Sequence, residues 1–241
     1  MRSSICVFYI ALFGLPAAAL AQAPAGDPDA LYRDRTNLSS ARDAVAIWDA
    51  RLKADPSNFE AAWKLARAMY WLGGHDVESA RRGQLERGVE AGRKAAALEP
   101  KRPEGYFWMA ADMGELAESF GLRQGLKYRG DIKDALETVL RIDPAYQKGS
   151  ADRALGRWYF KVPGLFGGSN KKSEEHLRKS LTYDPNNNAS HFFLAETLFD
   201  LNRDKEAREE LQKTIAAPVD PEWEAEDREF KKLAEERLKK K

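Results

Sequence analysis

The chain has 241 residues, with 39 Lys and Arg against 38 Asp and Glu, three His and a single Cys. A formal charge of +1 argues against a strongly basic nucleic-acid-binding protein and against a protein held on a charged membrane surface. β-Branched aliphatic residues are scarce, whereas Ala, Leu, Glu, Lys and Arg dominate. This composition disfavours a β-sheet core and favours helices.

The N-terminal residues have the order typical of a secretory signal peptide. An apolar run from Ile5 to Leu15 follows a basic residue, and Ala19-Leu20-Ala21 fits a small-x-small cleavage site. We therefore expect residues 1–21 to be a signal peptide and the protein to be periplasmic or secreted. Cleavage leaves Gln22 first and removes Cys6, so disulfides, cysteine catalysis and a lipid anchor are not expected. No membrane span is expected in the mature chain.

Five prolines along the chain each close a helical pattern: Pro56, Pro100, Pro144, Pro185 and Pro218. They are 44, 44, 41 and 33 residues apart. Because a proline cannot join the helix before it, this spacing predicts an array of helical hairpins. The longer intervals exceed the tetratricopeptide period of about 34 residues. We expect the extra residues to form long loops near residues 73–84, 114–130 and 160–172. The predicted fold is therefore all-α, a right-handed solenoid of antiparallel helix pairs with long intra-repeat insertions.

The last interval is the clearest repeat unit. Residues 191–198 and 207–214 each have helical periodicity, and residues 202–204 form a turn between them. This unit resembles the tetratricopeptide pattern. The highly charged helix that follows is typical of a terminal cap. We therefore divide the mature chain into a repeat domain, residues 22–219, and a C-terminal capping helix, residues 220–241.

Segments that could carry chemistry have simpler explanations. The stretch 164–173 has glycines before Lys and Ser, but it lacks the order and the leading strand of a phosphate-binding loop. We interpret it as a turn in which Ser169 or Asn170 caps the next helix. The histidines fall on separate units without a metal-ligand spacing, and the carboxylates have basic neighbours. We therefore expect no enzyme, no metal site and no cofactor.

Aromatic residues recur on the first helix of each unit, where residues seven apart share a face. First helices line the concave side of a tetratricopeptide stack, so we predict a groove there for an apolar ligand or a partner's helix. Gly114 and Ala151 stand where a ring would fill the space. The alternative, that the rings only pack between adjacent hairpins, stays open. The candidate groove residues are Trp63, Arg67, Tyr70, Phe107, Lys148, Trp158, Tyr159, Phe192, Glu196 and Phe199.

Three stretches resemble one known family. They are Asp-Pro-Ser-Asn-Phe-Glu-Ala-Ala-Trp at 55–63, Gly-Tyr-Phe-Trp-Met-Ala-Ala at 105–111, and Leu-Gly-Arg-Trp-Tyr at 155–159, which leads to Gly167-Gly168. Their order is similar to the T component of tripartite ATP-independent periplasmic transporters, or TRAP transporters. That resemblance implies an exported, tetratricopeptide-like accessory that partners a periplasmic substrate-binding protein and holds an apolar ligand. The lipobox cysteine expected in lipid-anchored members is missing here.

Two functions of different class follow from these observations. The first is an accessory component of a TRAP-type transporter that binds a substrate-binding protein, an apolar small ligand, or both. The second is a general tetratricopeptide scaffold for envelope proteins, with no link to transport. A protein partner is expected in both cases, and nucleic acid in neither.

Overall fold

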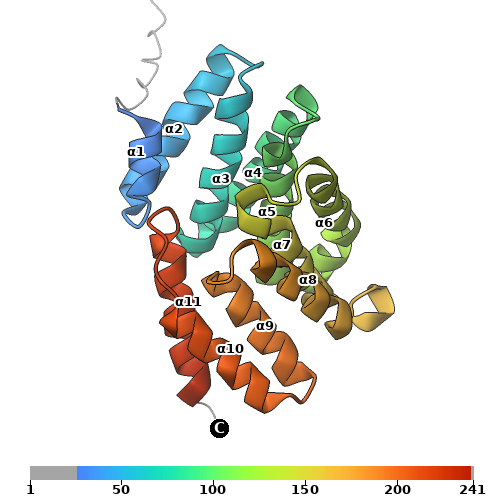
Figure 1. The fold of residues 1–241 in the computed structure, drawn as a ribbon. Helices are drawn as coiled ribbons and strands as arrows, with labels where there is room; N and C mark the ends of the chain where they lie inside the picture. The colour runs from blue at the N-terminus through green and yellow to red at the C-terminus, as the bar shows by residue number, and fades with distance from the viewer. Residues whose placement is uncertain (1–25, 240–241) are drawn as a thin grey trace, which may run out of the picture.

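The structure is a computed structural model that describes residues 26–239. Throughout this range the chain is helical, without a strand (Figure 1). None of these helices is long and apolar enough to cross a membrane. The predicted signal peptide, residues 1–21, lies outside the described residues. The α-helices are α1 (Pro28–Arg33), α2 (Leu38–Ala54), α3 (Phe59–His75), α4 (Glu78–Leu98), α5 (Pro103–Ser119), α6 (Leu122–Ile142), α7 (Tyr146–Lys161), α8 (Asn170–Tyr183), α9 (Asn188–Asp200), α10 (Asp204–Ala216) and α11 (Glu224–Lys239).

The helices form successive hairpins, α1/α2, α3/α4, α5/α6, α7/α8 and α9/α10, and α11 packs against α9 and α10 (Figure 1). Each of the five prolines directly follows the second helix of a hairpin. Asparagine side chains cap two of the next helices, since Asn58 Oδ1 accepts a hydrogen bond from the Ala61 amide and Asn187 Oδ1 accepts one from the Ser190 amide. The prediction of an all-α, tetratricopeptide-like solenoid is confirmed.

The extra residues of the longer units are mostly helical. Only residues 76–77 separate α3 from α4, and only residues 120–121 separate α5 from α6. The expectation of long loops near residues 73–84 and 114–130 is therefore wrong. Buried apolar side chains in or beside these stretches, such as Leu85 and Leu116, continue the buried faces of the helices, so the helices extend instead. The third insertion does contain a loop, with a short 3₁₀ turn at Gly164–Phe166.

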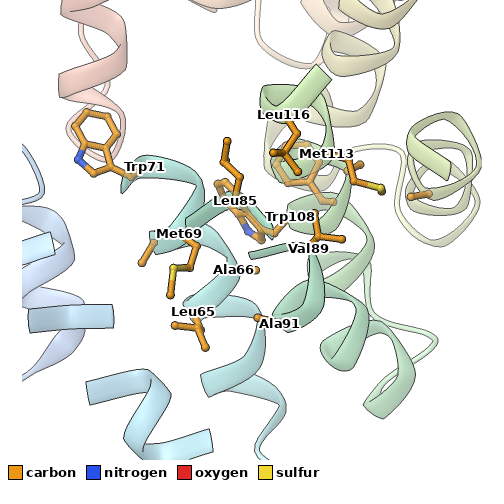
Figure 2. Close-up of a cluster of buried hydrophobic side chains, with 14 of the residues drawn as sticks. Leu65, Ala66, Met69, Trp71, Leu85, Val89, Ala91, Trp108, Met113 and Leu116 are labelled. Atoms are coloured by element: carbon orange, nitrogen blue, oxygen red, sulfur yellow. The ribbon is translucent and has the colours of Figure 1, made fainter. Parts of the chain in front are cut away.

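The main hydrophobic core extends from α1 to α7, and Figure 2 shows its centre, where α3, α4 and α5 meet. Met69, Leu85 and Trp108 are each at most 1% exposed there. Small residues bring α4 and α5 together, since a Cβ atom at Gly92 would lie 2.7 Å from the backbone nitrogen of Met109. Two smaller clusters continue this packing through α8, α9, α10 and α11.

The C-terminal segment returns to the first hairpins. We call residues 217–227, which link α10 to α11 and include the first turn of α11, the closing segment. Its Trp223 stacks on Trp108 of α5, with ring centroids 6.4 Å apart and planes 24° apart. Arg35, in the turn between α1 and α2, donates from Nε to Glu226 at 3.2 Å and from Nη2 to the Glu222 carbonyl at 3.1 Å. Figure 1 shows the start of α11 beside this turn. The solenoid is thus closed by contacts between its two ends.

Candidate functional site

The closing segment and the inner faces of α5, α6, α7 and α9 surround a cavity of about 830 Å³. This volume lies within the range of small-molecule sites in proteins, about 300 to 1,000 Å³. Aromatic and aliphatic side chains make up most of its wall, and they come from hairpins distant in sequence. The apolar lining residues include Tyr70, Phe107, Trp108, Leu126, Ile132, Leu136, Trp158, Phe193, Trp223 and Phe230.

Four of the ten candidate groove residues line this cavity: Tyr70, Phe107, Lys148 and Trp158. Gly114 lines it as well, and a Cβ atom added there would meet no other atom within 4 Å. The open space that the sequence suggests at Gly114 is therefore present. Ala151, the other small residue of that prediction, is buried away from the cavity.

Three of the other candidates pack between hairpins. The Arg67 guanidinium lies 4.1 Å from the centre of the Tyr32 ring and 5.1 Å from that of Trp63, so Arg67 joins α3 to α1 and Trp63 packs beside it against the main core. Phe192 packs against Phe230 of α11, with ring centroids 5.6 Å apart. For Trp63, Arg67 and Phe192, the structure matches the alternative of packing between repeats.

The last three candidates also lie outside the cavity. Tyr159 stacks on His176 between α7 and α8, with ring centroids 5.3 Å apart. Phe199 belongs to the packing between α9 and α11. Glu196 forms an ion pair with Arg157, which lines the cavity. Glu196 therefore contacts a residue of the wall without being part of the wall.

Trp158 combines the two roles that the sequence presents as alternatives. Its side chain belongs to the main core, and the residue is only 9% exposed. Its Nε1 donates to the Arg129 carbonyl at 2.9 Å, which fixes the ring against α6. The same ring forms part of the cavity wall. Trp158 therefore supports the fold and shapes the cavity together.

Ion pairs hold several of the charged groups at the wall. Glu118 lies 2.9 Å from Arg157 and 3.2 Å from Lys161. Although burial opposes ionisation, these cations hold the pKa of Glu118 below its usual range. Lys148 Nζ lies 2.7 Å from Asp220 and 3.9 Å from Asp184, and its hydrogen bond lowers the pKa of Asp220. These contacts join α5 to α7, and α7 to the closing segment.

The remaining wall carboxylates have partners too. Glu115 lies 3.3 Å from Arg81, and Glu226 forms an ion pair with Arg35. Asp227 accepts a hydrogen bond from the Asp220 amide at 2.9 Å, and burial raises its pKa. Each of these acidic side chains is bonded to a group of the protein.

Arg153 of α7 differs from the other charged wall residues. Its Nη1 is buried without a hydrogen-bond partner, and no described carboxylate lies within 4 Å of its guanidinium. Burial lowers the pKa of Arg153 to about 10, with Asp184 opposing this shift, so the side chain is still cationic at neutral pH. The cavity thus contains a half-buried cation, with its Nη1 fully buried, that has no counterion among residues 26–239. The sequence does not single out Arg153, because its neighbourhood resembles an ordinary charged helix face.

Other sequence features have structural roles. Ser169 Oγ accepts a hydrogen bond from the Lys172 amide at 3.3 Å, which confirms it as the cap of α8. The histidines bond to local partners, for example His176 Nδ1 to Asp152 at 2.7 Å and His191 Nε2 to the Pro185 carbonyl at 2.8 Å. In the described part of the chain, no three His, Cys, Asp or Glu side chains converge as a metal site.

Comparisons with known proteins agree with this fold. Residues 28–166 match the family described as regulator of microtubule dynamics protein 1-3, and residues 168–225 match a tetratricopeptide repeat family. Among curated proteins, none has a significantly similar sequence.

Several solved structures share the arrangement of helices. The tetratricopeptide protein TTC0263 of Thermus thermophilus is 21% identical, with a TM-score of 0.65 over 88% of this chain and 97% of its own. A MamA structure is 18% identical, with a TM-score of 0.52 over 83% of this chain and 95% of its own. MamA from Desulfovibrio magneticus RS-1 is also 18% identical, with a TM-score of 0.51 over 90% of this chain and 99% of its own. At these identities the likeness concerns the fold.

Proposed function

The chain belongs to the regulator of microtubule dynamics protein 1-3 family, and from that premise we propose that it is a tetratricopeptide-like binding protein whose cavity holds an apolar ligand. The observation that carries this proposal is the aromatic-lined cavity of about 830 Å³ beneath the closing segment. Burial of apolar surface in such a space is the main source of affinity for apolar ligands. The proposal does not depend on a microtubule partner.

Filling the cavity tests this function directly. Gly114 lies inside α5, and a side chain added there has open space before it. We expect Gly114→Phe to lower the affinity for the neutral apolar probe N-phenyl-1-naphthylamine at least tenfold, because the new ring occupies the volume of the ligand. The variant should fold normally, since phenylalanine is a better helix former than glycine. Fluorescence titration and a thermal melt measure both quantities.

Gly130→Phe is the matched control. Gly130 lies inside α6, is exposed, and also has open space around its Cβ position, but it does not line the cavity. This variant should bind the probe as tightly as the wild type does. If the wild type binds no probe, or if both variants bind it equally well, the cavity is not a ligand site.

We also propose a biological setting in which this binding protein acts. The apolar N-terminal run and the three stretches at 55–63, 105–111 and 155–159 support an exported accessory of a TRAP-type transporter. A general tetratricopeptide scaffold for envelope proteins fits the fold equally well. Tetratricopeptide proteins commonly bind other proteins, so a protein partner belongs to both settings.

Export gives a first prediction for this setting. We expect the mature protein to begin at Gln22 and to fractionate with the periplasm, as read by mass spectrometry of the purified chain. A pull-down from that fraction should recover a substrate-binding protein in the transport setting and an envelope-assembly protein in the other. An intact Met1 form found only in the cytoplasm would reject both settings and leave the cavity proposal standing.

A further inference from the structure

We propose that the cavity selects an amphiphile with a single carboxylate, of the long-chain fatty-acid type, and that this carboxylate pairs with Arg153. The inference rests on the proposed function, because it names the ligand class of the same cavity. It combines two observations, a half-buried guanidinium without a counterion in the cavity and an apolar wall around it.

The guanidinium of Arg153 provides the head-group site. A buried cation without a partner is costly, and an anionic ligand removes that cost by pairing with it. Arginine presents its N–H groups as a planar fork that matches the two oxygens of a carboxylate. Arg153 lines the cavity and its guanidinium makes no hydrogen bond to the described residues, so the part of the fork that faces the cavity is available to donate to a ligand. Arg153 therefore favours an anionic group over a neutral one.

The other cations at the wall are already occupied. Arg157 lies between Glu118 and Glu196, while Lys148 pairs with Asp220. The remaining arginine, Arg129, donates from Nη1 to the Leu126 carbonyl at 3.0 Å and lies over the Phe166 ring at 5.6 Å. Among the described wall cations, Arg153 is thus the one without a hydrogen bond or an ion pair to another residue. The single guanidinium of Arg153 can pair with one anionic group of a ligand.

The acidic side chains at the wall limit the charge of the head group. Asp184, Asp220, Glu226 and Asp227 all line the cavity together with Arg153. A phosphate dianion would bring a second negative charge among these carboxylates, and like charges at close range in a low-dielectric site repel strongly. A carboxylate carries only the charge that Arg153 neutralises. The wall therefore favours a monoanion.

The apolar wall accounts for the rest of the ligand. Rings from α5, α7 and the closing segment, among them Phe107, Trp158 and Trp223, face the same cavity as Arg153. A short polar acid would leave this surface without a partner, whereas an alkyl chain covers it. A long-chain carboxylate satisfies both the cation and the rings.

The test is displacement of N-phenyl-1-naphthylamine from the full chain by palmitate, hexadecan-1-ol and hexadecyl phosphate. These compounds share one chain and differ in head group. Palmitate should displace the probe from the wild type at a concentration at least tenfold lower than either of the other two. In Arg153→Gln, palmitate should lose this advantage over hexadecan-1-ol, while the neutral probe still binds.

Arg123→Gln is the matched control, because Arg123 is an exposed arginine of α6 outside the cavity. It should keep the wild-type preference for palmitate. An independent readout is the carboxyl carbon signal of bound 1-¹³C-palmitate, which should titrate at a lower pH in the wild type than in Arg153→Gln. If Arg153→Gln does not fold, Arg153→Lys, which keeps the charge without the fork, should show a reduced preference.

The outcomes separate the two proposals. If palmitate and hexadecan-1-ol displace the probe equally from the wild type, the carboxylate inference is wrong and the apolar cavity stands. If hexadecyl phosphate displaces the probe best, the cavity selects a dianion and the carboxylate inference is again wrong. If the wild type does not bind the probe at all, the proposed function fails together with this inference.

Discussion

Replacing Asp112 by asparagine is expected to stabilise the protein by an amount that increases with pH. Asp112 lies in the middle of α5 and is fully buried, and neither of its carboxylate oxygens has a hydrogen-bond partner among residues 26–239. Burial, and to a smaller degree the charge of Glu115, raises the pKa of Asp112 well above 3.8. The folded protein therefore keeps a proton on this side chain that the unfolded chain releases.

The sign of the pH dependence follows from this difference. Above pH 3.8 the unfolded chain loses the Asp112 proton, but the folded chain holds it until the pH reaches the raised pKa. Across that window the free energy of unfolding of the wild type falls by about 1.4 kcal/mol per pH unit from this group. Asparagine does not titrate, so the difference in free energy of unfolding between Asp112→Asn and the wild type should increase by the same amount per pH unit. Urea unfolding between pH 4 and pH 8 measures it.

The asparagine variant keeps the shape of a tightly packed site. A Cβ atom at Gly88 of α4 would lie 2.3 Å from Asp112 Oδ1, so a larger side chain at position 112 would force the two helices apart. Asp131→Asn is the control, because it makes the same substitution at a residue that is exposed on α6. A stability difference between Asp112→Asn and wild type that is constant with pH would mean that Asp112 is ionised in the folded protein.

Local sequence signals account for most of the fold. Prolines mark the end of each hairpin, and asparagines such as Asn58 and Asn187 begin the next helix, because capping and ring closure act within a few residues. Helix length is harder to predict, since the spacing of prolines shows how many residues a unit has but not whether they are helical.

A local signal also fails at the start of α7, where residues 147–149 have left-handed backbone angles although only Gly149 prefers them.

The cavity depends on contacts that periodicity does not contain. A spacing of seven residues shows that Trp63 and Tyr70 share a helix face, but the rotation of that helix is set by its neighbours. As a result Tyr70 lines the cavity, whereas Trp63 lies beside Arg67. The position of the closing segment is even harder to predict from periodicity, because the Arg35–Glu226 pair joins residues 191 positions apart. Periodicity alone therefore places Trp223 in a terminal cap and does not bring it to the cavity.

Loss of the Arg35–Glu226 pair is expected to have the second large effect. Arg35 is 4% exposed, lies about 5 Å from the rings of Tyr32 and Trp71, and has Glu226 as its carboxylate partner. Glu226→Gln leaves this buried cation unpaired, which should lower the free energy of unfolding by about 3 kcal/mol. Glu226 also lines the cavity, so a displaced closing segment should lower the affinity for N-phenyl-1-naphthylamine as well.

Two further variants separate the loss of the pair from a general effect of charge. Glu229→Gln removes a carboxylate of α11 that is 57% exposed and 3.7 Å from His75, so it should cost less than about 1 kcal/mol. The double variant Arg35→Met with Glu226→Met replaces both partners by apolar side chains and should recover most of the lost stability, because no unpaired charge remains. Chemical unfolding of the wild type, the single variants Arg35→Met and Glu226→Met, and the double variant gives the coupling energy of the pair. If Glu226→Gln costs no more than Glu229→Gln, the ion pair between the closing segment and the first hairpin does not stabilise the fold, and the cavity is held closed by other contacts, such as the stacking of Trp223 on Trp108 and the Lys148–Asp220 pair.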